Sequence, residues 1–197
     1  MLPSHHHAVQ FYEGESQLAG TVSGFLCEGL ICGHPAMVIA TAAHRAVILE
    51  AMHARFIDVS RVQRVGALLM LDAHKILSQL RISGSPERDR VAAVFGAQLA
   101  RAAGGLANKT VRAYGEIVDI LWQDGRTQAA LDLEALWNGL ARRHRFALLC
   151  GYRAESSCTQ DESFQAICDQ HTHVIGPDAR LTLPRRRRDA PPPSHHQ

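Results

Sequence analysis

The chain has 197 residues, which is enough for one hydrophobic core and short for two domains. Apolar residues make up 46% of it and charged residues 20%, and no apolar run approaches the roughly 20 residues that span a bilayer. The first residues lack the pattern of a secretory signal, and five cysteines form no disulfide framework, so we expect a cytoplasmic protein with reduced thiols.

The formal net charge of +2 is unevenly distributed along the chain. Residues from 181 onward hold Arg185 to Arg188 and one acid, Asp189, so the residues before them sum to a charge of −1. The near-neutral charge of the first 180 residues argues against direct nucleic-acid binding. We expect one domain over residues 4–177 and a disordered, basic, proline-rich tail over 178–197. A weak contact between this tail and an acidic partner or nucleic acid stays open.

The first half of the chain alternates β-prone runs with amphipathic stretches. Residues 8–12 predict a first strand, and residues 16–30 predict a helix whose apolar residues share one face and whose end is marked by glycines. The nearly continuous apolar run 35–41 is typical of a strand covered on both faces, and a helix is expected over 42–56. A third buried strand, 67–72, ends in a carboxylate.

The second half repeats this alternation. Helices are expected over 73–80 and 91–103, and strands over 110–114 and 146–152. Between those two strands the pattern predicts a helix, a turn marked by Gly125 and a second amphipathic helix; a last helix is expected over 161–169. Strands that alternate with helices in this way imply right-handed crossovers. The expected fold class is therefore α/β, with a doubly wound, mostly parallel sheet.

Polar and aromatic residues stand at or just after each expected strand. Open parallel sheets bind ligands beyond the carboxyl ends of their strands. The candidate ligand-binding residues from this rule are Tyr12, Glu13, Thr41, His44, Asp72, His74, Tyr114, Glu116, Cys150 and Tyr152. They would suit a small molecule, although any parallel sheet presents polar residues where its strands end.

Residues 14–21 and the run LLMLD resemble the nucleotide-binding core of KaiC- and RecA-type ATPases. This resemblance implies a three-layer core with a degenerate phosphate loop that contains Gly14, Gly20 and Thr21. The spacing of GxxxxGK[ST] survives, but Gly20 replaces the lysine, and residues 41–44 lack the water-activating glutamate of those enzymes. ATP hydrolysis is disfavoured. The alternative is a nucleotide-binding protein that holds Mg²⁺ through Thr21 and Asp72.

A second resemblance covers most of the domain and rests on an ordered set of segments. They are HAVQFY (7–12), GLICGHP (29–35), GEIV (115–118), LW (121–122), Gly125, LExxWN (133–138), LCGY (149–152) and IC with His171 (167–171). Together they resemble the MEDS family, the methanogen/methylotroph, DcmR-type sensory domain. The resemblance implies a sensory role toward small organic compounds, beside DNA-binding regulators or signalling kinases. No output domain accompanies these segments, so we expect a signalling or transcription-regulatory partner in trans.

Several residues of these segments allow two interpretations. His7 is either a ligand contact or a polar lead-in to the first strand. Glu116 could bind a ligand, or it could stabilise a helix N-terminus by about 0.3–1 kcal/mol. Glu134 and Asn138, four residues apart on one helical face, are expected to close a polar network. With Trp122, Trp137 and Cys150 they form the expected structural or relay set; the tryptophans are packing residues first.

The twelve histidines invite a metal hypothesis, but the spacings do not support one. The sequence contains no HExxH motif or CxxC pair, and Cys168-x-x-His171-x-His173 stands alone. There is also no GxSxG motif for a hydrolase. We therefore expect no metal, no cofactor and no enzymatic activity. Cys150 could sense redox state, but a buried, inert thiol is the more common outcome.

The leading functional hypothesis is a non-enzymatic sensory domain that binds a small organic ligand at the strand ends. Under this hypothesis, residues 111–152 connect the bound ligand to a helix that moves. The alternatives are the nucleotide-binding protein described above and a ligand-free adaptor that acts through surface patches. A homodimer is compatible with each of them.

Overall fold

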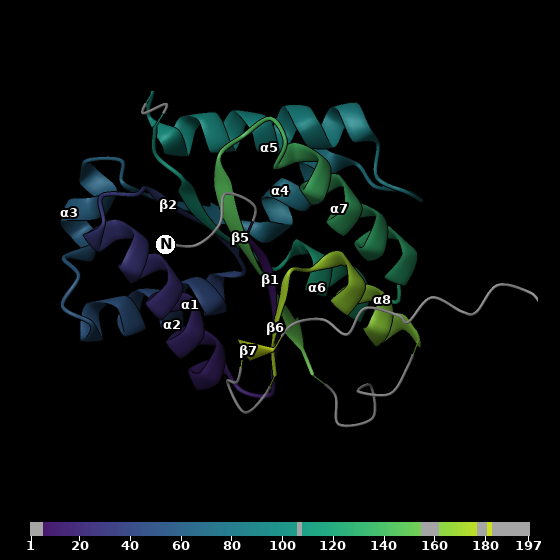
Figure 1. Cartoon of the computed structure of the whole chain (residues 1–197), viewed down its shortest axis with the longest axis horizontal. Coiled ribbons are helices and arrows are strands. Elements are labelled where there is room, and N and C mark those ends of the chain that lie inside the picture. The colour runs from purple at the N-terminus through teal and green to yellow at the C-terminus, as the bar shows by residue number, and fades with distance from the viewer. Residues whose placement is uncertain (1–5, 106–107, 155–161, 177–180, 183–197) are drawn as a thin grey trace, which may run out of the picture.

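A computed structural model describes residues 6–105, 108–154, 162–176 and 181–182, and these form a seven-stranded sheet between two layers of helices (Figure 1). The strand order is β3-β2-β4-β5-β1-β6-β7; the first six strands run parallel, and β7 is antiparallel to β6. The strands are β1 (His7–Tyr12), β2 (Ala36–Ala40), β3 (Leu68–Asp72), β4 (Val111–Gly115), β5 (Phe146–Arg153), β6 (His173–Ile175) and β7 (Leu181–Thr182).

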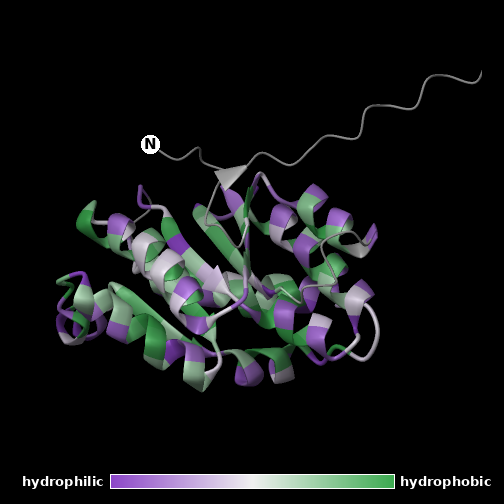
Figure 2. Ribbon diagram, turned by 90° about the horizontal axis from the view of Figure 1, so that it is seen from below, coloured by the Kyte–Doolittle hydropathy of each residue, from purple (hydrophilic) through white to green (hydrophobic). Residues whose placement is uncertain are grey.

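The helices divide between the two faces of the sheet. The first group is α1 (Glu15–Ile31), α2 (Ala42–Ala54) and α3 (Val59–Arg64). The second group is α4 (Ala73–Leu80), α5 (Arg88–Ala103), α6 (Ile117–Gln123), α7 (Thr127–Leu140) and α8 (Glu162–Gln170). Each group packs into its own hydrophobic cluster on one face, which makes a three-layer α/β protein as the sequence predicted. The hydrophobic and hydrophilic residues that alternate along the helices are visible in Figure 2.

The two clusters follow from the period of two along a strand. In β1, Val9 and Phe11 join the cluster of α4 to α8, whereas Ala8 and Tyr12 join the cluster of α1 and α2. In β5 the even-numbered residues from Phe146 to Tyr152 face α4 to α8, and Leu149 faces the other side. Residues one position apart in a strand therefore serve opposite layers.

The expected strands and helices are present, with shifts at their ends, and two kinds of element were missed. Helix α3 has no buried residue, so the apolar periodicity used to find helices was missing there, although Asp58 caps its first turn. Strand β6 is only three residues long and pairs with β1. Leu181 and Thr182 of the expected tail form β7, and residues 183–197 lie outside the described part of the chain.

The segment expected to be a degenerate phosphate loop is mostly helical, which corrects that expectation. Helix α1 begins at Glu15, directly after Gly14, so Gly20 and Thr21 lie within the helix. The Thr21 hydroxyl accepts a hydrogen bond from the buried Gln10 amide, at 2.9 Å. The resemblance of residues 14–21 to a phosphate loop is therefore one of spacing and does not extend to a loop conformation.

Asp72 lies far from Thr21. Asp72 ends the edge strand β3, whereas Thr21 contacts Gln10 of β1, and β1 is four strand positions from β3, or about 19 Å at the usual spacing. One Mg²⁺ ion cannot bind both residues at such a separation.

Within the described residues, no helix is long and apolar enough to cross a membrane.

Candidate functional site

The carboxyl ends of β1, β2 and β4 bring together five of the expected residues, here called the strand-end cluster: Tyr12, Thr41, His44, Tyr114 and Glu116. Glu116 is its centre and is almost fully buried. The Glu116 carboxylate accepts hydrogen bonds from the Thr41 backbone N–H and, at 3.2 Å, from the Tyr114 hydroxyl. It also lies 2.6 Å from His44 Nδ1. The cluster is thus a closed polar network around one carboxylate.

Asp119, which sequence reasoning missed, extends this network. The Tyr12 hydroxyl donates to Asp119 Oδ2 at 3.1 Å, and the Arg153 backbone N–H donates to Oδ1 at the same distance. The Arg153 guanidinium also lies over the Tyr12 ring, 5.7 Å from its centroid. The sequence contains only a weak signal for Asp119. It is an acidic residue in the first turn of a helix, where such residues commonly stabilise the helix N-terminus.

Burial and neighbouring charges shift several pKa values in this region. Burial is the main cause that raises the pKa of Asp119, Tyr12 and Tyr114 above their ordinary values. The hydrogen bond to Glu116 raises the pKa of His44, which favours an imidazolium–carboxylate pair. Because the folded-state pKa of His44 exceeds its unfolded value of 6.5, its contribution to stability is fully present below pH 6.5 and is lost as the pH rises through the folded-state pKa.

We therefore expect Glu116→Gln to destabilise the protein, and to do so more strongly at slightly acid pH than at alkaline pH. The difference in unfolding free energy between wild type and variant should shrink as the pH rises above 6.5 and through the raised pKa of His44, because the imidazolium loses its charge. Urea unfolding at several pH values measures it. The matched control is His53→Gln, because His53 is exposed on the same helix as His44. A difference that stays constant over this range would contradict the assigned pair.

Two other expected residues lie apart from the strand-end cluster. Asp72 caps α4 by accepting from the Lys75 N–H and pairs with Arg45 at 3.0 Å; these contacts lower its pKa. It lines an open pocket of about 400 Å³ at the edge of the sheet. The Glu13 side chain is exposed. These positions indicate a structural role for Asp72.

A second group, here called the interior cluster, consists of His7, Glu134, Cys150 and His171, all buried on the opposite face of the sheet. Glu134 projects from α7 between the other three side chains. Its Oε2 lies 3.1 Å from His7 Nε2 and 3.5 Å from Cys150 Sγ, and its Oε1 lies 3.5 Å from His171 Nε2. His7 Nε2 is also 3.4 Å from Cys150 Sγ.

Three further groups fix the orientation of the interior cluster. The Tyr152 hydroxyl donates to Glu134 Oε1 at 2.9 Å. His7 Nδ1 lies 3.0 Å from Asn138 Oδ1, and His171 Nδ1 lies 2.7 Å from the Ile167 carbonyl. Each imidazole is therefore held by its Nδ1 atom and directs Nε2 at Glu134.

The electrostatics of the interior cluster are dominated by burial. Burial lowers the pKa of His7 and, together with Glu134, raises the pKa of Cys150 and Tyr152 well above their ordinary values. Burial also opposes ionisation of Glu134, but the imidazoles of His171 and His7 hold its pKa below the ordinary value. A thiol with a raised pKa is unreactive, which argues against redox sensing by Cys150.

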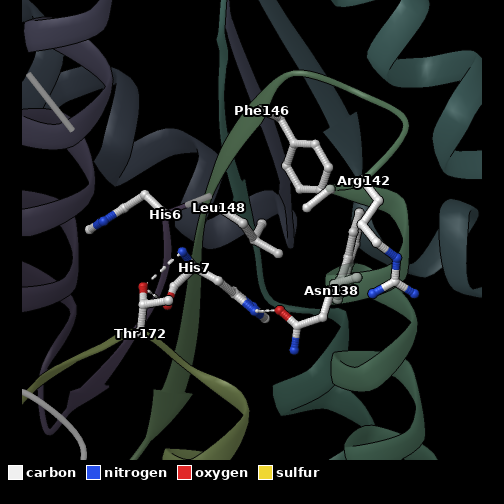
Figure 3. Close-up of a pocket in the computed structure, with 9 residues that line it drawn as sticks. His6, His7, Asn138, Arg142, Phe146, Leu148 and Thr172 are labelled. Carbon is white, nitrogen blue, oxygen red and sulfur yellow. Dashed lines mark hydrogen bonds between the residues drawn. The ribbon is translucent and has the colours of Figure 1, made fainter. Parts of the chain in front are cut away.

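A pocket of about 230 Å³, here called the α7 pocket, adjoins the interior cluster (Figure 3). It is lined by His6, His7, Trp137, Asn138, Ala141, Arg142, Phe146, Leu148 and Thr172. It lies at the amino ends of β1 and β5, whereas the sequence rule placed the ligand at their carboxyl ends. Burial lowers the pKa of His6 to about 4, so this pocket residue is uncharged at neutral pH.

The expected candidates thus separate into two sites instead of sharing one. Tyr152 and His7 belong with the interior cluster, where they meet Glu134, Asn138 and Cys150 of the expected relay set. Trp137 packs against Phe95 with ring centroids 4.1 Å apart, as expected of a core residue. Trp122 is half-buried against Tyr152. His171 was noticed in the sequence only in the family resemblance and in the isolated fragment Cys168-x-x-His171-x-His173, because its partners are distant in the chain.

The segments that carried that resemblance meet at this interior cluster. His7, Glu134, Asn138, Cys150, Tyr152 and His171 come from four of them and are linked by the contacts described above. No curated protein matches the chain. A family profile described as MEDS, the MEthanogen/methylotroph, DcmR Sensory domain, matches residues 6–172. Since that match spans most of the sequence, the chain belongs to the MEDS family of sensory domains.

Proposed function

We propose that this sensory domain binds a small organic molecule in the α7 pocket and passes the signal to a separate partner protein. The single observation that carries the proposal is the position of the pocket. It opens beside His7 and Asn138, which are hydrogen-bonded to each other and lie in segments that resemble the MEDS family, within the matched residues 6–172. The sensory character of the family supports a ligand-dependent role.

The chemistry of the lining favours a small, mainly apolar ligand. Phe146, Leu148 and Ala141 supply apolar surface, while Asn138 and Arg142 offer polar groups at one side (Figure 3). A volume of about 230 Å³ is below the roughly 300–1,000 Å³ of sites for drug-sized ligands, so the ligand has only a few non-hydrogen atoms.

Helix α7 supports a route for the signal. It carries the pocket residues Trp137 and Asn138, and it also carries Glu134 at the centre of the interior cluster. A ligand that contacts Asn138 bears on α7 directly and on β1 through His7. We propose that the partner reads the position of α7 or the adjoining α8, which gives residues 111–152 the relay role expected from the sequence.

A pocket-filling variant tests the ligand site. Ala141→Leu adds side-chain volume to the lining of the pocket, so it should abolish the thermal stabilisation that small alcohols, ketones or halogenated hydrocarbons give the wild type. Ala135→Leu, at an exposed position of α7, should leave that stabilisation intact. A thermal-shift screen of full-length protein measures both, with Mg-ATP as a comparison.

The screen also separates the competing functions. Stabilisation by Mg-ATP alone would contradict the proposal and favour a nucleotide-binding protein, although α1 offers no phosphate loop and Thr21 and Asp72 are far apart. Stabilisation by no compound would favour an adaptor without a ligand.

A further inference from the structure

Four potential metal-ligating atoms converge in the interior cluster, each from a different part of the fold. They are His7 Nε2 in β1, Cys150 Sγ in β5, a carboxylate oxygen of Glu134 in α7 and His171 Nε2 after α8, and all lie within 4.8 Å of one another. Ligand atoms about 2.0–2.3 Å from a tetrahedral Zn²⁺ are separated by about 3.3–3.8 Å. Glu134 Oε2, His7 Nε2 and Cys150 Sγ are 3.1–3.5 Å from one another, close to that spacing, and His171 Nε2 lies 3.5 Å from the other carboxylate oxygen, Oε1.

The hydrogen bonds around the two imidazoles leave their Nε2 atoms without protons to donate when the rings are neutral. His171 Nδ1 must donate to the Ile167 carbonyl, which is only an acceptor. The Asn138 side-chain N–H donates a hydrogen bond to the Gln170 carbonyl at 3.0 Å. The Asn138 oxygen therefore faces His7 and accepts a hydrogen bond from the Nδ1–H group of His7.

Lone pairs therefore face one another at the centre of the cluster. In neutral rings both Nε2 atoms present lone pairs to the Glu134 carboxylate, and His171 Nε2 has no hydrogen-bond partner although it is buried. A buried polar atom without a partner destabilises the folded protein. A cation bound between these atoms would satisfy all of them.

The surroundings match those of metal-binding histidines. Ligating imidazoles usually donate their second N–H to a carbonyl, amide or carboxylate oxygen, and ligating carboxylates are themselves hydrogen-bonded. Asn138, the Ile167 carbonyl and the Tyr152 hydroxyl supply those three contacts here.

We propose that His7, Glu134, Cys150 and His171 bind a divalent transition-metal ion, with Zn²⁺ as the best match. Two imidazoles, a carboxylate and the thiolate that forms when the ion displaces the Cys150 proton make a borderline-soft donor set, which favours zinc-class ions over Mg²⁺ or Ca²⁺. Four protein ligands fill a tetrahedral shell, so the ion is structural. It ties β1 and β5 to α7 and α8 beside the α7 pocket. The metal site is proposed whether or not the α7 pocket binds a ligand.

Cobalt substitution tests the site through its colour. Full-length protein stripped with a chelator and titrated with Co²⁺ should bind one equivalent, with a thiolate-to-cobalt charge-transfer band and the intense d–d bands of a tetrahedral ion; Zn²⁺ should then displace them. Histidines outside the cluster can bind Co²⁺ without producing the thiolate band. A wild type that shows no such band at one equivalent would overturn the proposal, whatever the variants do.

Matched variants identify the ligands. Cys150→Ser should lose the charge-transfer band and weaken binding at least tenfold, and Glu134→Gln should also weaken it at least tenfold. Cys27→Ser, which alters a buried cysteine of the opposite layer, should bind like the wild type. A band that survives in Cys150→Ser would place the metal on another thiol and contradict the assignment. Circular dichroism of each metal-free variant establishes that it is folded.

Discussion

Replacing Glu134 by alanine is expected to lower the free energy of unfolding by about 3–5 kcal/mol, measured in chelator by urea denaturation. The carboxylate is fully buried and is the acceptor for the Tyr152 hydroxyl. Its removal leaves the buried Tyr152 hydroxyl without its acceptor, and a cavity remains at the end of the truncated side chain.

Asp132→Ala is the matched control for this substitution. Asp132 lies on the same helix but accepts only an exposed hydrogen bond from Gln128, so its loss should cost less than about 0.5 kcal/mol. Glu134→Gln should fall between the two, because the amide oxygen still accepts from Tyr152 while its NH₂ group replaces one carboxylate oxygen. Equal costs for Glu134→Ala and Asp132→Ala would contradict the central position of Glu134.

Trp137→Ala is expected to be comparably destabilising, by about 3–5 kcal/mol. The indole is only 4% exposed and contacts the rings of Phe95 and Phe146, at centroid distances of 4.1 and 6.0 Å. Truncation also opens the α7 pocket into the core, so the variant should accept larger apolar compounds than the wild type. Chemical denaturation and the thermal-shift screen measure the two effects.

Trp122→Ala provides the comparison for that variant. Trp122 is half-buried and makes an edge contact with Tyr152 across 5.8 Å, away from the residues of the α7 pocket. It should lose less stability than Trp137→Ala and leave ligand size preference unchanged. If the two variants shift ligand preference alike, the pocket is not where we place it.

The architecture could be predicted because the strands carry their own signal. Runs such as residues 36–40 are apolar throughout, since both faces of that strand are covered, and the glycine turn between α6 and α7 was also visible. Helix α3 and strand β6 could not be predicted, since one has no buried face and the other is too short for a period to show.

The site was only half predictable for a different reason. The carboxyl-end rule found Glu116, His44 and Tyr114 because each lies at the carboxyl end of a strand or shortly after it. It assigned Tyr152 to the same rim, although the alternation along β5 points that side chain at Glu134 on the other face. His7 and His171 are 164 positions apart, and the pairing of β1 with β6 brings them together, so no local motif could reveal the interior cluster.

The most direct test of the account is a crystal structure of the full chain with the compound that stabilises it most in the screen. We predict electron density for that compound in the α7 pocket, in contact with Asn138 and Leu148 and with α7 displaced relative to the unliganded protein. Density for it among Glu116, His44 and Tyr12 at the strand ends, with the α7 pocket unchanged, would contradict the account.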